Sequence, residues 1–209
     1  MDRRDAIGRV ALIMGGAVIG AEFFISGCKP TSTQVSDLFD TDHVAFLNEV
    51  ADTILPTTAA SPGAKAANVG QFMAVMVRDC YEPKDQKVFL EGTKKLDDAS
   101  RKKYNSKFLD LTPELRTQLL IALDKEQKDY YTQQYKNMNA EAAKHKGDAK
   151  YKAPDIPNHY FKMIKELTLL GYYTSEVGAT KALRYIETPG HYDGCMDYKK
   201  GDKAWAIDD

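Results

Sequence analysis

The stretch TDHVAFLNEVADTILP (residues 41–56) decides the fold class of this chain. Its apolar side chains recur every three or four positions, which is the spacing of one face of an α-helix. Thr41 or Asp42 suits the N-cap, and Pro56 suits the end because proline lacks a backbone N–H and disrupts a continuing helix. We therefore expect an amphipathic helix whose apolar face packs on a core.

The same periodicity, punctuated by proline and by capping residues, continues along the chain. It predicts helices from Val69 to Cys80, from Pro83 through Leu96, from Pro113 past Tyr135, from Asn158 to Gly171 with Phe161, Ile164, Leu167 and Leu170 on one face, and a short one after Thr174 or Ser175. The far end of the long fourth helix is polar and is expected to project into solvent. Residues 137–152 are rich in Lys and Ala and predict a weakly ordered surface excursion.

No run of residues shows the strict alternation of a half-buried β-strand. Charged residues make up 28% and hydrophobic residues 43% of the 209 positions, which is an ordinary composition for a folded globular domain. We predict an all-α fold, with a single helical domain that carries long loops over residues 41–209.

The N-terminus carries the features of an export signal. Arg3 and Arg4 precede an apolar run of about twelve residues, which is shorter than the roughly 20 needed to span a bilayer. The sequence Ile-Ser-Gly-Cys that ends at Cys28 matches the processing box of bacterial lipoproteins. We predict a cleavable twin-arginine lipoprotein signal peptide at residues 1–27, lipidation of Cys28 and a tether over residues 28–40. The domain would then be anchored on the periplasmic side of a membrane; an ordinary secretory signal with a chance arginine pair is the alternative.

If Cys28 is lipidated, the mature domain keeps two cysteines, Cys80 and Cys195. A pair of cysteines in an oxidising compartment favours a disulfide, which would close a loop of about 115 residues and contribute roughly 4–5 kcal/mol. Two free thiols are the second interpretation. A metal site formed with His191 is the third, although the close cysteine spacing of structural zinc sites is missing.

The sequence contains no local motif for a dinucleotide, a nucleoside phosphate, a nucleophilic serine or covalent haem. Its four histidines are scattered, and no two stand four positions apart, so we interpret them as single exposed side chains. We therefore predict no catalytic, cofactor-binding or metal-binding residue in this chain. Because its net charge is −1 and its lysines are interleaved with acids, nucleic-acid binding has little support.

Two short clusters combine aromatic and polar side chains. The sequence GYYTSE (residues 171–176) forms a helix-to-helix corner that either recognises a ligand or holds the turn. The sequence PGHYDGC (residues 189–195) forms a constrained loop that either docks into a partner or is simply a tied turn. Because aromatic residues dominate the centres of protein interfaces, we expect the aromatic side chains near predicted loops to anchor a partner: Tyr172, Tyr173, Tyr192 and Trp205.

A set of segments spans residues 42–206: EVADTILP (49–56), PGAK (62–65), DCY (79–81), GYYTSE (171–176), and the span from Tyr185 through Pro189-Gly190 and Gly194-Cys195 to Ala204-Trp205. In combination, this set resembles the gluconate 2-dehydrogenase subunit 3 family.

The resemblance implies a non-catalytic small subunit of a periplasmic FAD-dependent sugar or glucoside dehydrogenase of GMC type. The FAD would lie in the large catalytic subunit, and a cytochrome c would carry the electrons onward. The small subunit would escort the folded large subunit through twin-arginine export and stabilise it. Two alternatives stay open, namely a free-standing lipid-anchored binding or structural protein and an oxidoreductase in its own right.

Overall fold

The computed structural model describes residues 38–148, 150–188, 190–191 and 193–206, which belong to one compact unit, Leu38–Asp209. The predicted export signal with Arg3 and Arg4, the lipidation site at Cys28 and most of the tether lie outside the described residues, as does Tyr192. Within the described residues, no helix combines the length and the apolar character needed to cross a membrane.

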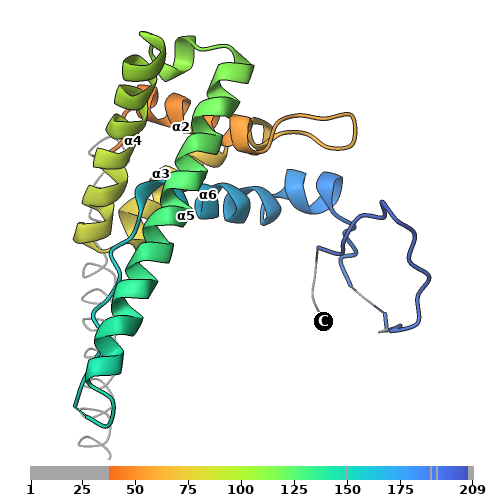
Figure 1. Cartoon of the computed structure of the whole chain (residues 1–209). Helices are drawn as coiled ribbons and strands as arrows, with labels where there is room; N and C mark the ends of the chain where they lie inside the picture. The colour runs from red at the N-terminus through yellow and green to blue at the C-terminus, as the bar shows by residue number, and fades with distance from the viewer. Residues whose placement is uncertain (1–37, 149, 189, 192, 207–209) are drawn as a thin grey trace, which may run out of the picture. The chain divides into compact units, whose positions relative to one another are not determined.

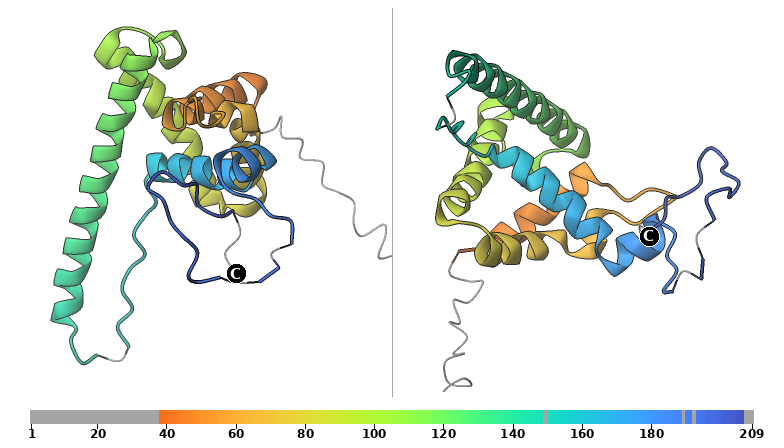
Figure 2. Two further views of the ribbon diagram at one scale, coloured as in Figure 1. Left: turned by 90° about the vertical axis from the view of Figure 1, so that its right-hand side faces the viewer. Right: turned by 90° about the horizontal axis from the view of Figure 1, so that it is seen from below.

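The predicted all-α fold is confirmed. The elements are α2 (Thr41–Ile54), η2 (Ala64–Ala67), α3 (Val69–Cys80), α4 (Pro83–Tyr104), η3 (Phe108–Asp110), α5 (Pro113–Lys144), α6 (Tyr160–Tyr173) and the π-helical turn η4 (Gly178–Ala182). The part of the chain that the structure describes contains no strand, only an isolated bridge between Arg184 and Trp205. Figures 1 and 2 show α5 as a long helix whose C-terminal half extends beyond the other helices.

The start of α2 differs by one or two residues from the predicted cap. Asp40, rather than Thr41 or Asp42, is the N-cap, and its carboxylate accepts a hydrogen bond from the backbone N of His43 at 2.8 Å. Such a bond satisfies one of the four N–H groups that a helix start leaves without a partner. The predicted end holds, since α2 stops at Ile54, two residues before the proline.

The start of α6 also differs from the prediction. His159 is the N-cap, and its Nδ1 accepts a hydrogen bond from the backbone N of Phe161 at 3.3 Å. Burial lowers the pKa of His159, which favours the neutral ring that can accept at Nδ1. Asn158, the expected cap, instead donates from its side chain to the Asp85 carboxylate of α4 at 3.0 Å.

α5 is anchored to the core only through its first half. Its buried residues are Leu119, Leu120, Leu123 and Gln127. The expected loss of order after residue 137 is not found before Lys144, because the helix continues through lysine and alanine, which have high helix propensity. The far half of α5 projects into solvent, as predicted.

The core lies where α2, α3 and α6 meet. Its buried side chains include Leu47 and Val50 of α2, Met73 and Val77 of α3, and Ile164 and Leu167 of α6. Gly171, the predicted end of a helix, lies within α6 instead. A Cβ at Gly171 would be 2.5 Å from the ring of Phe72, so this glycine allows the close approach of α6 to α3.

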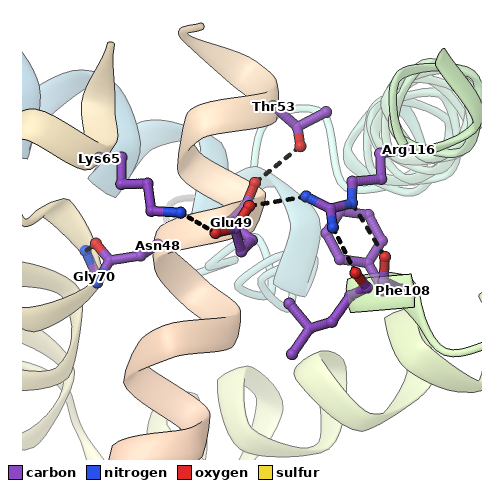
Figure 3. A network of polar contacts seen from close by, with 8 residues as sticks. Asn48, Glu49, Thr53, Lys65, Gly70, Phe108 and Arg116 are labelled. Carbon is purple, nitrogen blue, oxygen red and sulfur yellow. Dashed lines mark hydrogen bonds and ion pairs between the residues drawn. The ribbon is translucent and has the colours of Figure 1, made fainter. Parts of the chain in front are cut away.

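An ion-pair network ties three elements together at Glu49 of α2 (Figure 3). The Glu49 carboxylate accepts hydrogen bonds from Lys65 Nζ beside it and from Arg116 Nη1 of α5, the second at 2.7 Å. The Arg116 guanidinium also donates to the backbone oxygens of Phe108 and Leu109 in η3. One carboxylate therefore connects α2 to η2 and to the start of α5.

This network makes the fold sensitive to acid. The hydrogen bond from Lys65, together with that from Arg116, holds the pKa of Glu49 below its usual value, although partial burial opposes the shift. A carboxyl group with a lowered folded pKa contributes stability above its unfolded pKa of about 4.3, and this stability is lost as the pH falls through the folded pKa.

We expect Glu49→Gln to lower the free energy of unfolding at neutral pH by about 2 kcal/mol, because Arg116 and Lys65 lose a charged acceptor. For a domain of this size, the melting temperature would fall by about 4–8 °C. The difference from the wild type should shrink in acid, where both side chains are neutral. Scanning calorimetry between neutral and acidic pH measures this effect.

Glu91→Gln is the matched control, since the Glu91 carboxylate on α4 is exposed and lies 3.9 Å from Lys87 Nζ. Exposed pairs contribute about 0–1 kcal/mol. Equal losses in the two variants would contradict a special role of Glu49.

Gly92→Ala tests the contact between α4 and α6, because a Cβ at Gly92 would lie 2.1 Å from the Cβ of Tyr160. The two helices must separate, and we expect a loss of about 2–3 kcal/mol in urea unfolding. At Gly190, no atom lies within 4 Å of an added Cβ. Gly190→Ala should therefore leave stability nearly unchanged, and a similar loss at both sites would refute the steric explanation.

Candidate partner-binding surface

Tyr172 lies inside the protein rather than on its surface. Its side chain is 3% exposed, and its hydroxyl donates to the backbone oxygen of Pro62. Ser175 Oγ donates to the Tyr172 backbone oxygen at 2.6 Å and accepts from Gly178 N at 3.0 Å. These contacts hold the corner at residues 171–176, and they leave Tyr172 unable to face a partner.

The neighbouring Tyr173 faces solvent. It is 40% exposed, and its ring packs edge-on against Tyr172 with 5.2 Å between ring centroids. Leu169 and Leu170 are also exposed. Because residues three and four positions apart are neighbours on a helix, these three side chains form one apolar face at the end of α6.

The chain after η4 forms a loop that is closed at its base, which we call the C-terminal loop (residues 183–206). Arg184 N donates to Ala204 O, and Ala206 N donates to Arg184 O, both at 2.8 Å. The Arg184 guanidinium lies 5.5 Å from the centroid of the Trp205 ring, and its Nη2 lies 3.2 Å from the Asp202 carboxylate. Backbone and side-chain contacts around Arg184 therefore join the two ends of the loop.

The C-terminal loop exposes large apolar side chains. Trp205 is 41% exposed and Tyr198 is 77% exposed, and the others are Tyr185, Ile186 and Met196. Exposed apolar side chains that gather on one part of a protein mark interaction sites more often than scattered ones do.

Lys203 attaches the C-terminal loop to the rest of the domain. Its Nζ donates to the backbone oxygens of Lys181 in η4 and of Ala60, the second at 3.4 Å. Figures 1 and 2 show the loop that contains Ala60 and the C-terminal loop on the same side of the helices. The end of α6 and the C-terminal loop thus make up one candidate region, which we call the docking surface.

Cys80 and Cys195 are free and exposed, so the predicted disulfide is not formed in this structure. Cys80 ends α3 with its Sγ 3.9 Å from Met76 Sδ, and Cys195 lies in the C-terminal loop, where its backbone N donates to Asp193 Oδ1 at 2.9 Å. Each cysteine therefore belongs to its own local set of contacts. Among the described residues, no group of three potential ligands gathers at a metal-binding distance.

Two of the predicted anchors, Tyr173 and Trp205, are exposed in the docking surface. Its other exposed apolar side chains were not predicted. Leu170, which we expected on the buried face of its helix, is 46% exposed. The helical phase could have shown this, because Leu170 falls away from the face that carries Ile164 and Leu167. Residues in the C-terminal loop have no such periodicity.

The fold and the docking surface together define a small all-α protein that presents aromatic side chains suited to contact with another protein. The sequence profile described as gluconate 2-dehydrogenase subunit 3 matches residues 41–190, and the chain belongs to this family. The family implies a role as a subunit of a dehydrogenase complex. Searches among curated proteins and among solved structures gave no match.

We expect Arg184→Ala to open the base of the C-terminal loop, because the variant loses the contacts to the Trp205 ring and to Asp202. Amide hydrogen exchange at Ala206 N should rise by about tenfold, because the lost cation–π contact and ion pair together stabilise the closed loop by roughly 1.4 kcal/mol. The melting temperature should change little, because the ring contact and the ion pair of this side chain both lie within the C-terminal loop. Lys200→Ala, at an exposed position in the same loop, is the control; faster exchange in that variant as well would contradict the closing role of Arg184.

Proposed function

We propose that this chain is the non-catalytic small subunit of a periplasmic FAD-dependent sugar or glucoside dehydrogenase of GMC type. Family membership supports the role in a dehydrogenase complex. The exposed apolar side chains of the docking surface support direct contact with the large subunit. The FAD belongs to that large subunit in this proposal, and a cytochrome c accepts its electrons.

The observation that carries the proposal is the C-terminal loop with Trp205 and Tyr198 exposed and its base closed by Arg184. A tryptophan or tyrosine side chain removes about 150–250 Å² from water when it is buried, which makes it an effective interface anchor. A loop whose ends are already joined loses less conformational entropy on binding than an open one. The loop is therefore suited to stable association.

We further infer that the chain escorts its large subunit during export. The twin-arginine machinery carries folded cargo, so a signal at residues 1–27 on the small subunit would serve both chains of a preformed complex. Lipidation of Cys28 would then hold the complex at the membrane. The sequence motifs around Arg3, Arg4 and Cys28 support both steps.

The test is to purify the wild-type chain from its native host, to identify the proteins bound to it by mass spectrometry and to record the flavin absorbance spectrum. We expect a flavoprotein to co-purify. The double variant Tyr173→Ala with Trp205→Ala should weaken this association at least about a hundredfold, because each interface anchor contributes about 2 kcal/mol.

Tyr135→Ala is the matched control, because Tyr135 is a 50% exposed tyrosine of α5 outside the docking surface. It should leave co-purification unchanged. A wild-type chain that arrives without a flavoprotein would overturn the proposed function. A flavoprotein that binds the double variant as tightly as the wild type would overturn the docking surface alone.

A further inference from the structure

The far half of α5 and the segment that returns from it form an arm, residues 128–158. The Tyr130 hydroxyl donates to the backbone oxygen of Pro157 at 3.0 Å, and the backbone N of His159 donates to the Tyr131 hydroxyl at 3.0 Å. Figure 1 shows the return segment running back beside α5. The base of the arm is therefore fixed to the domain.

The outer part of the arm, which we call the tip (residues 136–152), has a folded turn. The rings of His145 and Tyr151 stack with 4.3 Å between centroids and an interplanar angle of 5°. Asp148 N donates to His145 O at 3.0 Å, and Tyr151 N donates to Asp148 O at 3.2 Å. The stacked rings and the two backbone hydrogen bonds therefore stabilise a turn from His145 to Tyr151.

The tip is basic. It carries five lysines against Glu141 and Asp148, so its formal net charge is +3, whereas the whole chain has a net charge of −1 and the rest therefore −4. The five lysines are all exposed: Lys136, Lys144, Lys146, Lys150 and Lys152. The Glu141 carboxylate lies 2.7 Å from Lys144 Nζ and 3.4 Å from His145 Nε2. Its negative charge is therefore directed to these two side chains and compensates the charge of the other lysines only in part.

A second lysine-rich stretch, residues 94–107, differs in its surroundings. Lys94, Arg101 and Lys107 line one hollow together with carboxylates: Asp40, Asp42, Asp97 and Asp98. Arg101 pairs with Asp97 at 2.9 Å. The three cations of this hollow therefore have carboxylates beside them, whereas among the described residues only Lys144 of the tip lysines forms an ion pair.

The composition of the tip fits lipid headgroups better than a protein partner. Protein interfaces are depleted in lysine and enriched in aromatic residues and arginine. Among the described residues of the tip, no large apolar side chain is exposed. A lysine ammonium acts as a point charge toward phosphate and needs no fixed geometry, which suits a fluid array of headgroups.

We propose that the tip binds the headgroups of anionic phospholipids at a membrane surface. The attraction is electrostatic, and it acts within about 10 Å at 0.1 M salt. Each lysine near such a surface strengthens binding by about fivefold. This contact requires neither the catalytic subunit nor the docking surface, so it stands or falls independently of the proposed function.

The test measures the partition of the full chain onto vesicles of mixed phosphatidylglycerol and phosphatidylcholine and onto vesicles of phosphatidylcholine alone. The wild type should prefer the anionic vesicles, and the preference should vanish at about 1 M salt, where the screening length is about 3 Å. The triple variant Lys146→Gln, Lys150→Gln and Lys152→Gln should partition roughly 100-fold less onto the anionic vesicles.

Two further variants sharpen the outcome. Arginine at the same three positions should keep the binding, since it keeps the charge. The matched control replaces Lys94, Arg101 and Lys107, all exposed and all beside the carboxylates of the hollow, with glutamine and should bind like the wild type. Because every variant retains the N-terminal segment, its contribution cancels, and circular dichroism verifies that each variant is folded.

The proposal is overturned if the wild type shows no preference for anionic vesicles. It is also overturned if the tip variant and the control variant lose binding equally, because the effect would then follow from net charge alone. Binding of the tip to an acidic protein, with no vesicle preference, would be a third contradicting result.

Discussion

The carboxylate of Glu49 links parts of the chain that are far apart in sequence. It joins α2 to Lys65 in η2 and to Arg116 in α5, and Arg116 in turn fixes two backbone oxygens of η3. Together with the buried side chains Leu119, Leu120 and Leu123, these contacts hold the first half of α5 against the three-helix core.

Much of the helical frame could be predicted from local residues, because the start and the end of a helix depend mainly on the capping and proline residues next to them. Pro83 and Thr112-Pro113 marked two starts correctly, and the helix from Val69 to Cys80 has the predicted bounds. The caps Asp40 and His159 were missed, since the choice among adjacent polar residues depends on tertiary contacts. Asn158 illustrates this, because its amide is held by Asp85 of another helix.

The docking surface was harder to predict, because exposure is a property of the packed molecule. Tyr172 and Tyr173 are adjacent and chemically alike. Tyr172 is nevertheless buried, with its hydroxyl bonded to the backbone oxygen of Pro62, whereas Tyr173 faces solvent. The pairing of Arg184 with Trp205 joins residues separated by a loop without periodicity. The disulfide expected from cysteine counting is not formed in the structure, where Cys80 and Cys195 have separate local contacts.

The length of α5 has a mechanical consequence. Its last buried residue is Gln127, and the helix continues to Lys144. At 1.5 Å per residue, this places the end of the helix about 25 Å beyond the core. The hydrogen bond between His159 N and the Tyr131 hydroxyl restrains the orientation of the helix where it leaves the core. The distance between the core and the tip at the end of α5 is therefore fixed by the rise of the helix. A flexible tether of the same number of residues would leave that distance variable.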